Sequence, residues 1–180
     1  MADTATTFGI GDPVPAFTLT DTEGARHALP AEQAAPATVL IQTCNHCPYV
    51  IAWNPRLRAV AEEYAPRGVR FLAINSNNPE THPADSPERM AQFVREQDWP
   101  IPYAFDESQD VARALGSART PEVFVLDGGQ RLVYHGAPDS NHEDPSANAA
   151  WLRAALDAVL EGHEVERAET PPRGCSVKWR

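Results

Sequence analysis

The sequence predicts an α/β protein in which helices flank a mixed central sheet. Residues 37–43 and 68–75 are continuous apolar, β-branched runs, which are typical of strands buried within a parallel sheet. Residues 122–127 and 131–136 flank the turn sequence GGQ and indicate a β-hairpin. Strands that alternate with helices favour right-handed parallel connections, so the hairpin should add antiparallel strands at one edge of the sheet.

Local signals place the other elements. Residues 15–20 and 25–30 lie on either side of the turn-like DTEG and predict a short N-terminal β-hairpin extension. Residues 49–65 have helical periodicity, and Pro55 should kink this helix because it removes a backbone donor. Further expected elements are a helix from the N-cap Ser86 to about Gln97, a strand at 103–106, a helix at 108–116 ended by Gly116, and a last helix at 146–162.

Length and composition restrict the class of protein. The 180 residues are expected to form one domain, with residues 163–180 as an irregular C-terminal tail. The 15 basic and 25 acidic side chains leave a net charge of −10, which argues against nucleic acid or an anionic membrane as a partner. No run of about 18 apolar residues is present, as a membrane span would need. The first residues, MADTATTFGIGD, lack the basic and apolar regions of a secretory signal, so we expect a cytoplasmic protein.

Two of the three cysteines form a C-x-x-C pair in the stretch QTCNHCPYV. The pair lies where a buried strand should end and a helix begin, and unpaired N–H groups at a helix N-terminus stabilise a thiolate. We therefore expect Cys44 to attack a substrate disulfide, and Cys47, one turn further along, to resolve the mixed disulfide. His46 lies between them, and a partly protonated imidazole there would also favour the thiolate. The alternative for His46 is a solvated surface side chain.

A metal site is the competing interpretation of this pair. A structural zinc site needs four ligands, whereas Cys175 stands alone near the C-terminus and the other histidines are scattered without ligand spacing. A purely structural disulfide across so short a loop would add little stability. We expect no metal and no cofactor, and keep a copper- or zinc-binding module as an alternative.

Two motifs resemble the thioredoxin superfamily. One is C-x-x-C-P after a buried strand, and the other is Thr120-Pro121 directly before the strand EVFVLD. The resemblance implies a thioredoxin-like fold with a cis Pro121 beside the cysteines and Thr120 facing them. The opening GDPVPAFTLTDTEG is similar to the redoxin branch, and together with DSPERM and GCSVKW it is closest to a peroxiredoxin-like subfamily.

The sequence departs from the peroxidatic pattern of peroxiredoxins. That pattern places Pro seven residues and Thr or Ser three residues before the reactive cysteine. Ala37 and Ile41 occupy these positions relative to Cys44, and Leu40 and Cys44 relative to Cys47. Cys44 and Cys47 therefore both lack the neighbouring groups that make a cysteine react rapidly with peroxide.

A second departure concerns proton transfer. Thioredoxins have a buried Asp six residues before the first cysteine, where this chain has Thr38. Glu122, directly after Pro121, is a candidate for that role, and a surface carboxylate is the alternative.

The leading hypothesis from the sequence is a thiol–disulfide oxidoreductase that acts on protein or small-molecule disulfides and thiols with an unidentified electron donor. The alternative enzyme is a thiol peroxidase that uses Cys44 and resolves with Cys47 or Cys175.

The third cysteine lies in the sequence GCSVKWR. Gly174 allows a turn, and Val177 and Trp179 alternate as anchors of an extended segment would. Cys175 is therefore either an inert residue of an anchored tail or a second resolving thiol. In the second case we expect a Cys44–Cys175 disulfide on mild oxidation of a Cys47→Ser variant.

Overall fold

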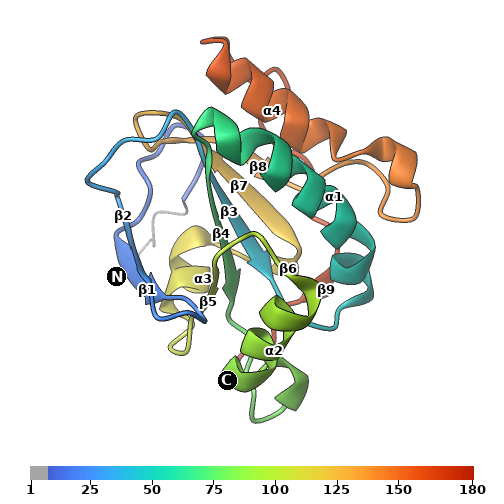
Figure 1. Cartoon of the computed structure of the whole chain (residues 1–180). Helices are drawn as coiled ribbons and strands as arrows, with labels where there is room; N and C mark the ends of the chain where they lie inside the picture. The colour runs from blue at the N-terminus through green and yellow to red at the C-terminus, as the bar shows by residue number, and fades with distance from the viewer. Residues whose placement is uncertain (1–7) are drawn as a thin grey trace, which may run out of the picture.

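A five-stranded mixed sheet forms the centre of the protein, in the order β5-β4-β3-β7-β8 (Figure 1). The computed structural model describes residues 8–180. The first seven residues of MADTATTFGIGD, the stretch compared above with a secretory signal, lie outside this range. The sheet strands are β3 (Thr38–Thr43), β4 (Arg70–Asn75), β5 (Tyr103–Phe105), β7 (Glu122–Leu126) and β8 (Leu132–Gly136). Two two-stranded ribbons accompany it: β1 (Phe17–Thr20) with β2 (Arg26–Leu29), and β6 (Arg119–Thr120) with β9 (Cys175–Ser176).

The pairing agrees with the sequence prediction. Strand β3 pairs in parallel with β4 and antiparallel with β7, and β8 completes the hairpin at one edge. All six residues of β3 are buried, as expected for a strand covered on both faces. The N-terminal hairpin β1–β2 is also present, as expected from DTEG.

Alternate residues of the central strands face two apolar layers. Val39 and Ile41 of β3 belong to the larger layer, which includes side chains of the helices α1 (Pro48–Tyr64) and α4 (Ala150–Leu160). Leu40 belongs to the other layer, under α3 (Asp110–Leu115) and the β1–β2 hairpin. Figure 1 shows α1 and α4 together on one side of the sheet and α3 on the other. Helices thus cover both faces, as predicted.

Two helix ends follow their sequence signals. Helix α2 (Pro87–Gln97) begins after Ser86, whose hydroxyl accepts a hydrogen bond from Arg89 N at 3.3 Å. Helix α3 ends at Gly116, which has a φ of 71°, a conformation that glycine adopts without strain. Helix α1 is assigned as one continuous element, with Pro55 inside it.

The last helix is shorter than predicted. Residues 146–162 were expected to form one helix, but a separate 3₁₀ turn, η3 (Pro145–Ala147), precedes α4. Asn148 and Ala149 between them have positive φ values of 55° and 50°. The Ala149 N–H donates to the buried carboxylate of Asp139 at 2.8 Å, so a tertiary contact replaces the expected helical hydrogen bond.

Asp139 is also the partner of a buried cation on α1. Arg56 Nη1 lies 2.9 Å from Asp139 Oδ2, and Trp53 Nε1 donates to Asp139 Oδ1 at 2.9 Å. The side chains of Arg56 and Asp139 are 6% and 1% exposed, so water cannot replace either partner. This group of contacts fixes α1 against the loop that leads to α4.

Replacing Asp139 by Ala should therefore destabilise the fold strongly. The change leaves the Arg56 guanidinium buried without its counter-charge, a loss typically worth about 3–5 kcal/mol. We expect chemical denaturation to report a decrease of that size in the free energy of unfolding. Glu166→Ala, at an exposed carboxylate, is the control and should change stability by less than about 0.5 kcal/mol. Equal stabilities of the two variants would contradict a structural role for Asp139.

Candidate redox-active site

The cysteine pair lies where β3 ends, and both thiols are buried. Cys44 is 5% and Cys47 3% exposed. The relation of the pair to the helix differs from the prediction. Helix α1 starts only at Pro48, so Cys47 is its N-cap residue and Cys44 lies before the helix. Cys47 therefore does not lie one turn inside the helix, because Pro48 supplies the first helical position. The unpaired N–H groups of α1 thus favour a thiolate at Cys47 more than at Cys44.

Thr120 contacts both cysteines of the pair. The peptide bond between Thr120 and Pro121 is cis, as the family resemblance implied. Cys44 Sγ lies 3.6 Å from Thr120 Oγ1, and Cys47 Sγ lies 3.5 Å from the carbonyl oxygen of Thr120. The prediction that Thr120 faces the cysteines is thus confirmed.

The third cysteine belongs to the same cluster. Strand β9 pairs antiparallel with β6, and this register sets Cys175 opposite Thr120. The sulfur atoms of Cys175 and Cys47 are 2.7 Å apart, and all three cysteines are free thiols. The expectation that Cys175 lies near the pair is confirmed, but its contact is Cys47. No hydrogen bond joins Cys175 to Cys44 among residues 8–180.

His46 interacts with an acidic residue rather than with the thiols. Its Nδ1 lies 3.2 Å from Asp85 Oδ2, its side chain is 45% exposed, and its ring stacks on that of His82 at 6.2 Å between centroids. In the described part of the chain, no hydrogen bond joins the imidazole to Cys44 or Cys47. A direct effect of His46 on the thiolate stays a prediction.

Asp85 is a site residue that the sequence analysis missed. Its side chain is fully buried, and its Oδ1 accepts the backbone N–H of Asn45 at 2.7 Å, within the C-x-x-C loop. Asn75 and Asn77 donate to the same carboxylate at 3.3 and 2.9 Å. The sequence offered one signal, an acidic residue directly before the helix cap Ser86, but such residues are usually solvated. Only the fold shows that Asp85 holds the cysteine loop.

Glu122 stabilises the chain before Pro121. The side chain is 1% exposed, so it is not a surface carboxylate. It accepts the Ala118 N–H at 2.8 Å and forms an ion pair with His135, also at 2.8 Å. No contact with a cysteine occurs among residues 8–180, and a role of Glu122 in proton transfer stays a prediction.

Interactions inside the cluster separate the pKa values of the two central thiols. Interaction with Cys47, burial and the nearby Asp85 carboxylate raise the pKa of Cys44. The pKa of Cys47 is lowered, chiefly by interaction with Cys44, and further by Cys175 and the backbone of Val50 at the start of α1. One proton thus stays on Cys44, and the negative charge of the reduced pair resides on Cys47. Burial, followed by the neighbouring Cys47, raises the pKa of Cys175 to about 11.

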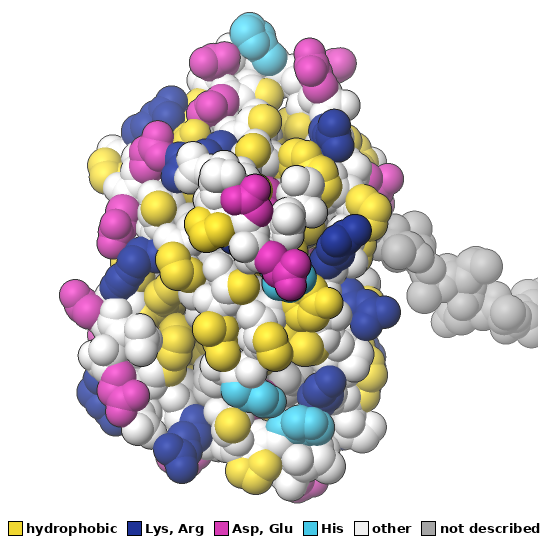
Figure 2. All heavy atoms as spheres, turned by 90° about the vertical axis from the view of Figure 1, so that its right-hand side faces the viewer, with side chains coloured by type: hydrophobic (Ala, Val, Ile, Leu, Met, Phe, Trp, Pro, Cys, Tyr) yellow, Lys and Arg dark blue, Asp and Glu magenta, His cyan; other side chains and the backbone are white. Residues whose placement is uncertain are grey.

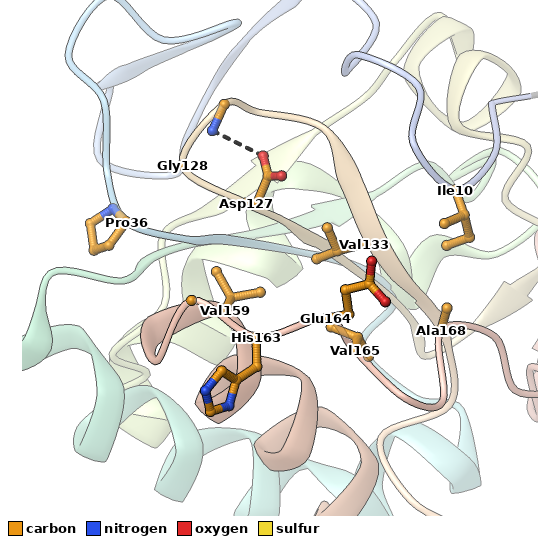
Figure 3. A pocket seen from close by; sticks show the side chains of 12 residues that line it. Ile10, Pro36, Asp127, Gly128, Val133, Val159, His163, Glu164, Val165 and Ala168 are labelled. Atoms are coloured by element: carbon orange, nitrogen blue, oxygen red, sulfur yellow. Dashed lines mark hydrogen bonds between the residues drawn. The ribbon is translucent and has the colours of Figure 1, made fainter.

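One large pocket is remote from the cysteines. It has a volume of about 710 Å³ and is lined by Pro36 before β3, the turn at Asp127–Gly129 after β7, and residues after α4 (Figure 3). Cys44 lies beyond the opposite end of β3, so the pocket is not part of the cysteine cluster. The face in Figure 2 mixes acidic, basic and apolar side chains and shows no patch of one charge.

Residues 8–180 contain neither a candidate metal-binding cluster nor a candidate membrane-spanning helix. No group of three or more His, Cys, Asp or Glu side chains there is arranged so that it could hold a metal ion. None of the helices in this part of the chain is both long and apolar enough to span a membrane.

Comparison with solved structures shows that the fold is thioredoxin-like. The Redoxin family model matches residues 10–151, and the chain therefore belongs to the Redoxin family. This confirms the superfamily and the redoxin branch inferred from the motifs. A comparison with curated proteins gives no match.

Two similar structures are those of conserved bacterial proteins. An uncharacterized conserved protein from Geobacillus kaustophilus is 39% identical, with a TM-score of 0.91 over 97% of this chain and 94% of that one. A hypothetical protein from Sinorhizobium meliloti 1021 is 36% identical, with a TM-score of 0.89 over 97% of both chains. Peroxidoxin BcpB from Mycobacterium tuberculosis is 21% identical, with a TM-score of 0.63 over 86% of this chain and 97% of that one. At that identity the likeness shows the fold alone.

The charge of the reduced pair can be measured by pH titration. Because the pKa of Cys47 lies below its ordinary value of 9.0, a thiolate should remain as the pH falls from 9.0 to neutrality and disappear only below the lowered pKa. We expect the ultraviolet absorbance of the thiolate to follow this course in the reduced protein. Cys47→Ser should remove the neutral-pH signal, whereas Cys44→Ser should move it to higher pH because a donor is lost. A neutral-pH signal that survives Cys47→Ser would contradict the assignment.

Asp85→Asn should make Cys44 more reactive. The change removes a negative charge that raises the pKa of Cys44, yet keeps an oxygen that can accept the Asn45 N–H. In a Cys47→Ser background we expect iodoacetamide to alkylate Cys44 several-fold faster at neutral pH, and the free energy of unfolding to fall by about 1–3 kcal/mol. Glu88→Gln, at an exposed position on α2, is the control and should change neither quantity. An unchanged alkylation rate in Asp85→Asn would show that the carboxylate does not act on Cys44.

Proposed function

We propose that the protein is a thiol–disulfide oxidoreductase whose reactive centre is the dithiol pair Cys44 and Cys47. The proposal rests chiefly on the contacts of Thr120 with both sulfurs, 3.6 Å to Cys44 and 3.5 Å to Cys47. The residue before the cis proline thus lies beside both sulfurs, where an extended disulfide substrate could bind. Membership of the Redoxin family supports a redox function of the thiols.

Cys44 is the proposed nucleophile, although the thiolate of the resting pair is on Cys47. The sulfur of Cys47 is in contact with Cys175 and with the Thr120 carbonyl, which obstruct the approach of a substrate disulfide. Cys44 has a hydroxyl beside it that can donate to a developing thiolate. The Cys47 thiolate can take the proton of Cys44 as the attack begins, so the pair itself can supply the base, although Thr38 stands where thioredoxins have a buried Asp.

The reaction consists of two exchanges. Cys44 Sγ forms a bond to one substrate sulfur, the substrate S–S bond breaks, and the other substrate sulfur leaves as a thiolate that water protonates. Cys47 then loses its proton to solvent and attacks Cys44, which forms the Cys44–Cys47 disulfide and releases the second substrate thiol. The substrate is reduced by two electrons, and an electron donor must return them to the pair. The same steps in reverse oxidise a dithiol substrate.

Variants of the two cysteines test the assignment with oxidised glutathione as the probe. We expect Cys44→Ser to abolish glutathione reduction, and Cys47→Ser to accumulate a glutathione mixed disulfide on Cys44, because resolution is lost. Mass spectrometry of the intact protein and its peptides measures the adduct. Glutathione attached mainly to Cys47, with Cys44→Ser still active, would reverse the two roles.

The same variants separate exchange from peroxidase activity. Neither cysteine has a Thr or Ser three residues before it, so hydrogen peroxide should be reduced far more slowly than the disulfide. Hydrogen peroxide consumption that is faster than glutathione exchange and lost in Cys44→Ser would overturn the proposal in favour of a thiol peroxidase.

A further inference from the structure

Cys175 occupies a position that several independent contacts define. Its strand β9 pairs with β6, so the backbone carbonyl of Cys175 accepts a hydrogen bond from Thr120 Oγ1 at 3.4 Å. Its side chain packs with Cys44, Cys47 and Val50 in a small apolar cluster. Figure 1 shows β6 and β9 side by side near the start of α1. The contact between Cys175 and Cys47 is therefore part of an ordered structure.

Gly174 allows this close approach. It has a φ of +156°, and a Cβ at this position would lie 1.9 Å from the Thr120 carbonyl oxygen. No other residue fits there without moving β9 away from β6. The glycine next to Cys175 thus allows the sulfur to reach Cys47.

The chain after Cys175 is anchored to the body. Val177 is 3% exposed, and its N–H donates to Ala118 O at 3.1 Å. The Lys178 N–H donates to the buried Asn77 side chain at 2.8 Å, and its carbonyl accepts from Gln109 Nε2 at 3.0 Å. Trp179 is 41% exposed and contacts Arg113, 5.0 Å from the ring centroid to the guanidinium. These contacts of the residues directly after Cys175 hold Cys175 in place.

We infer that Cys175 is a third redox thiol, and that the oxidised protein carries its disulfide between Cys47 and Cys175 with Cys44 free. The inference rests on the proposed function, because the disulfide first forms between Cys44 and Cys47. It replaces the Cys44–Cys175 pairing expected from the sequence, since the sulfur that Cys175 contacts is that of Cys47.

The step is an internal thiol–disulfide exchange that needs no added oxidant. The Cys175 thiol loses its proton to solvent and attacks Cys47 Sγ, which forms the Cys47–Cys175 bond and breaks the Cys44–Cys47 bond. Cys44 leaves as a thiolate, accepts a hydrogen bond from Thr120 Oγ1 and takes a proton from water. In the disulfide, Cys47 carries no negative charge, so one of the causes that raise the pKa of Cys175 is absent at that moment.

Because of the exchange, the substrate and the electron donor would react at different cysteines. Substrate reacts at Cys44, which is 5% exposed, whereas Cys175 is half-buried and more accessible to a reductant. An electron donor with two thiols could attack Cys175 with the first, which releases Cys47 as a thiolate. Its second thiol would then attack the donor sulfur bound to Cys175, which releases the Cys175 thiol and leaves the donor as a disulfide. Cys44 would be available again as soon as the internal exchange is complete.

Peptide mapping of the oxidised wild-type protein tests this pairing. The protein is oxidised with a slight excess of oxidised glutathione, acid-quenched, alkylated with N-ethylmaleimide and digested with trypsin. Cys44 and Cys47 fall in one peptide, His27–Arg56, and Cys175 in another, Gly174–Lys178. We expect these two peptides to be linked, with the alkyl group on Cys44 in fragment spectra. A disulfide confined to His27–Arg56 with Cys175 alkylated, or a linked pair with the alkyl group on Cys47, would overturn the inference.

Two variants test the pairing without relying on the equilibrium between the Cys44–Cys47 and Cys47–Cys175 disulfides in the wild-type protein. Cys44→Ser cannot start the exchange with glutathione, but when oxidised with the dithiol oxidant diamide it should form an intramolecular Cys47–Cys175 disulfide, and only intermolecular dimers in this variant would count against the inference. Gly174→Ala keeps all three cysteines but displaces β9, so the linked peptides should decrease several-fold. Gly162→Ala is the matched control, because its φ of +74° is also positive but a Cβ there meets nothing within 4 Å. An equal linked fraction in both glycine variants would contradict the role of the β6–β9 pairing.

The result is separable from the test of the proposed function. If Cys47→Ser forms no mixed disulfide on Cys44 while the wild type carries the Cys47–Cys175 disulfide, the proposed attack fails and the third redox thiol is supported. If the mixed disulfide forms and Cys175 stays alkylated in every oxidised sample, the inference of a third redox thiol fails and the proposed function stands.

Discussion

The position of β3 is the constraint on which the rest of the protein depends. Its six residues are all buried, and pairing with β4 on one side and β7 on the other holds its register. Alternate side chains of this strand enter the two apolar layers. A one-residue shift in its register would therefore move each side chain into the opposite layer. Cys44 follows directly after this strand. The core therefore fixes where Cys44 lies, and the geometry of the cysteine cluster depends on the packing of the whole sheet.

A second layer of structure holds the loop around the cysteines. Asp85 bonds the backbone of Asn45, and Asn45 also accepts from the hydroxyl of Tyr103 on β5 at 2.8 Å. A buried carboxylate near a thiol has two effects here, since it orders the loop and also keeps the proton on Cys44. The helix start acts in the opposite direction on Cys47. The contact between the two sulfurs, aided by the Asp85 carboxylate and the start of α1, thus divides one proton between them.

Thr120 connects the pair with the C-terminal tail. Its hydroxyl and carbonyl contact Cys44 and Cys47, and its backbone pairs with β9, which carries Cys175. The residues considered irregular from sequence, 163–180, therefore contain a short strand that completes the site. Further contacts of the tail support this: Thr170 Oγ1 accepts the Ala137 N–H at 3.0 Å, close to the exit of β8. Because the tail is anchored at several points, removal of its last residues would disturb the cysteine cluster as well as the surface.

The sequence by itself determined the sheet, its helices and the dithiol pair. Apolar runs, caps and turn residues are local signals, and the C-x-x-C and Thr-Pro motifs together carried the resemblance that placed Thr120 beside Cys44. Only the tertiary structure decided what depends on residues far apart in the chain. Asp85 and Cys175 approach the pair across 40 and 128 residues, respectively, and Asp139, through its contact with Ala149, makes the last helix start later than expected. These contacts have no periodicity or spacing to reveal them, because burial and charge pairing are settled only when the whole chain has packed.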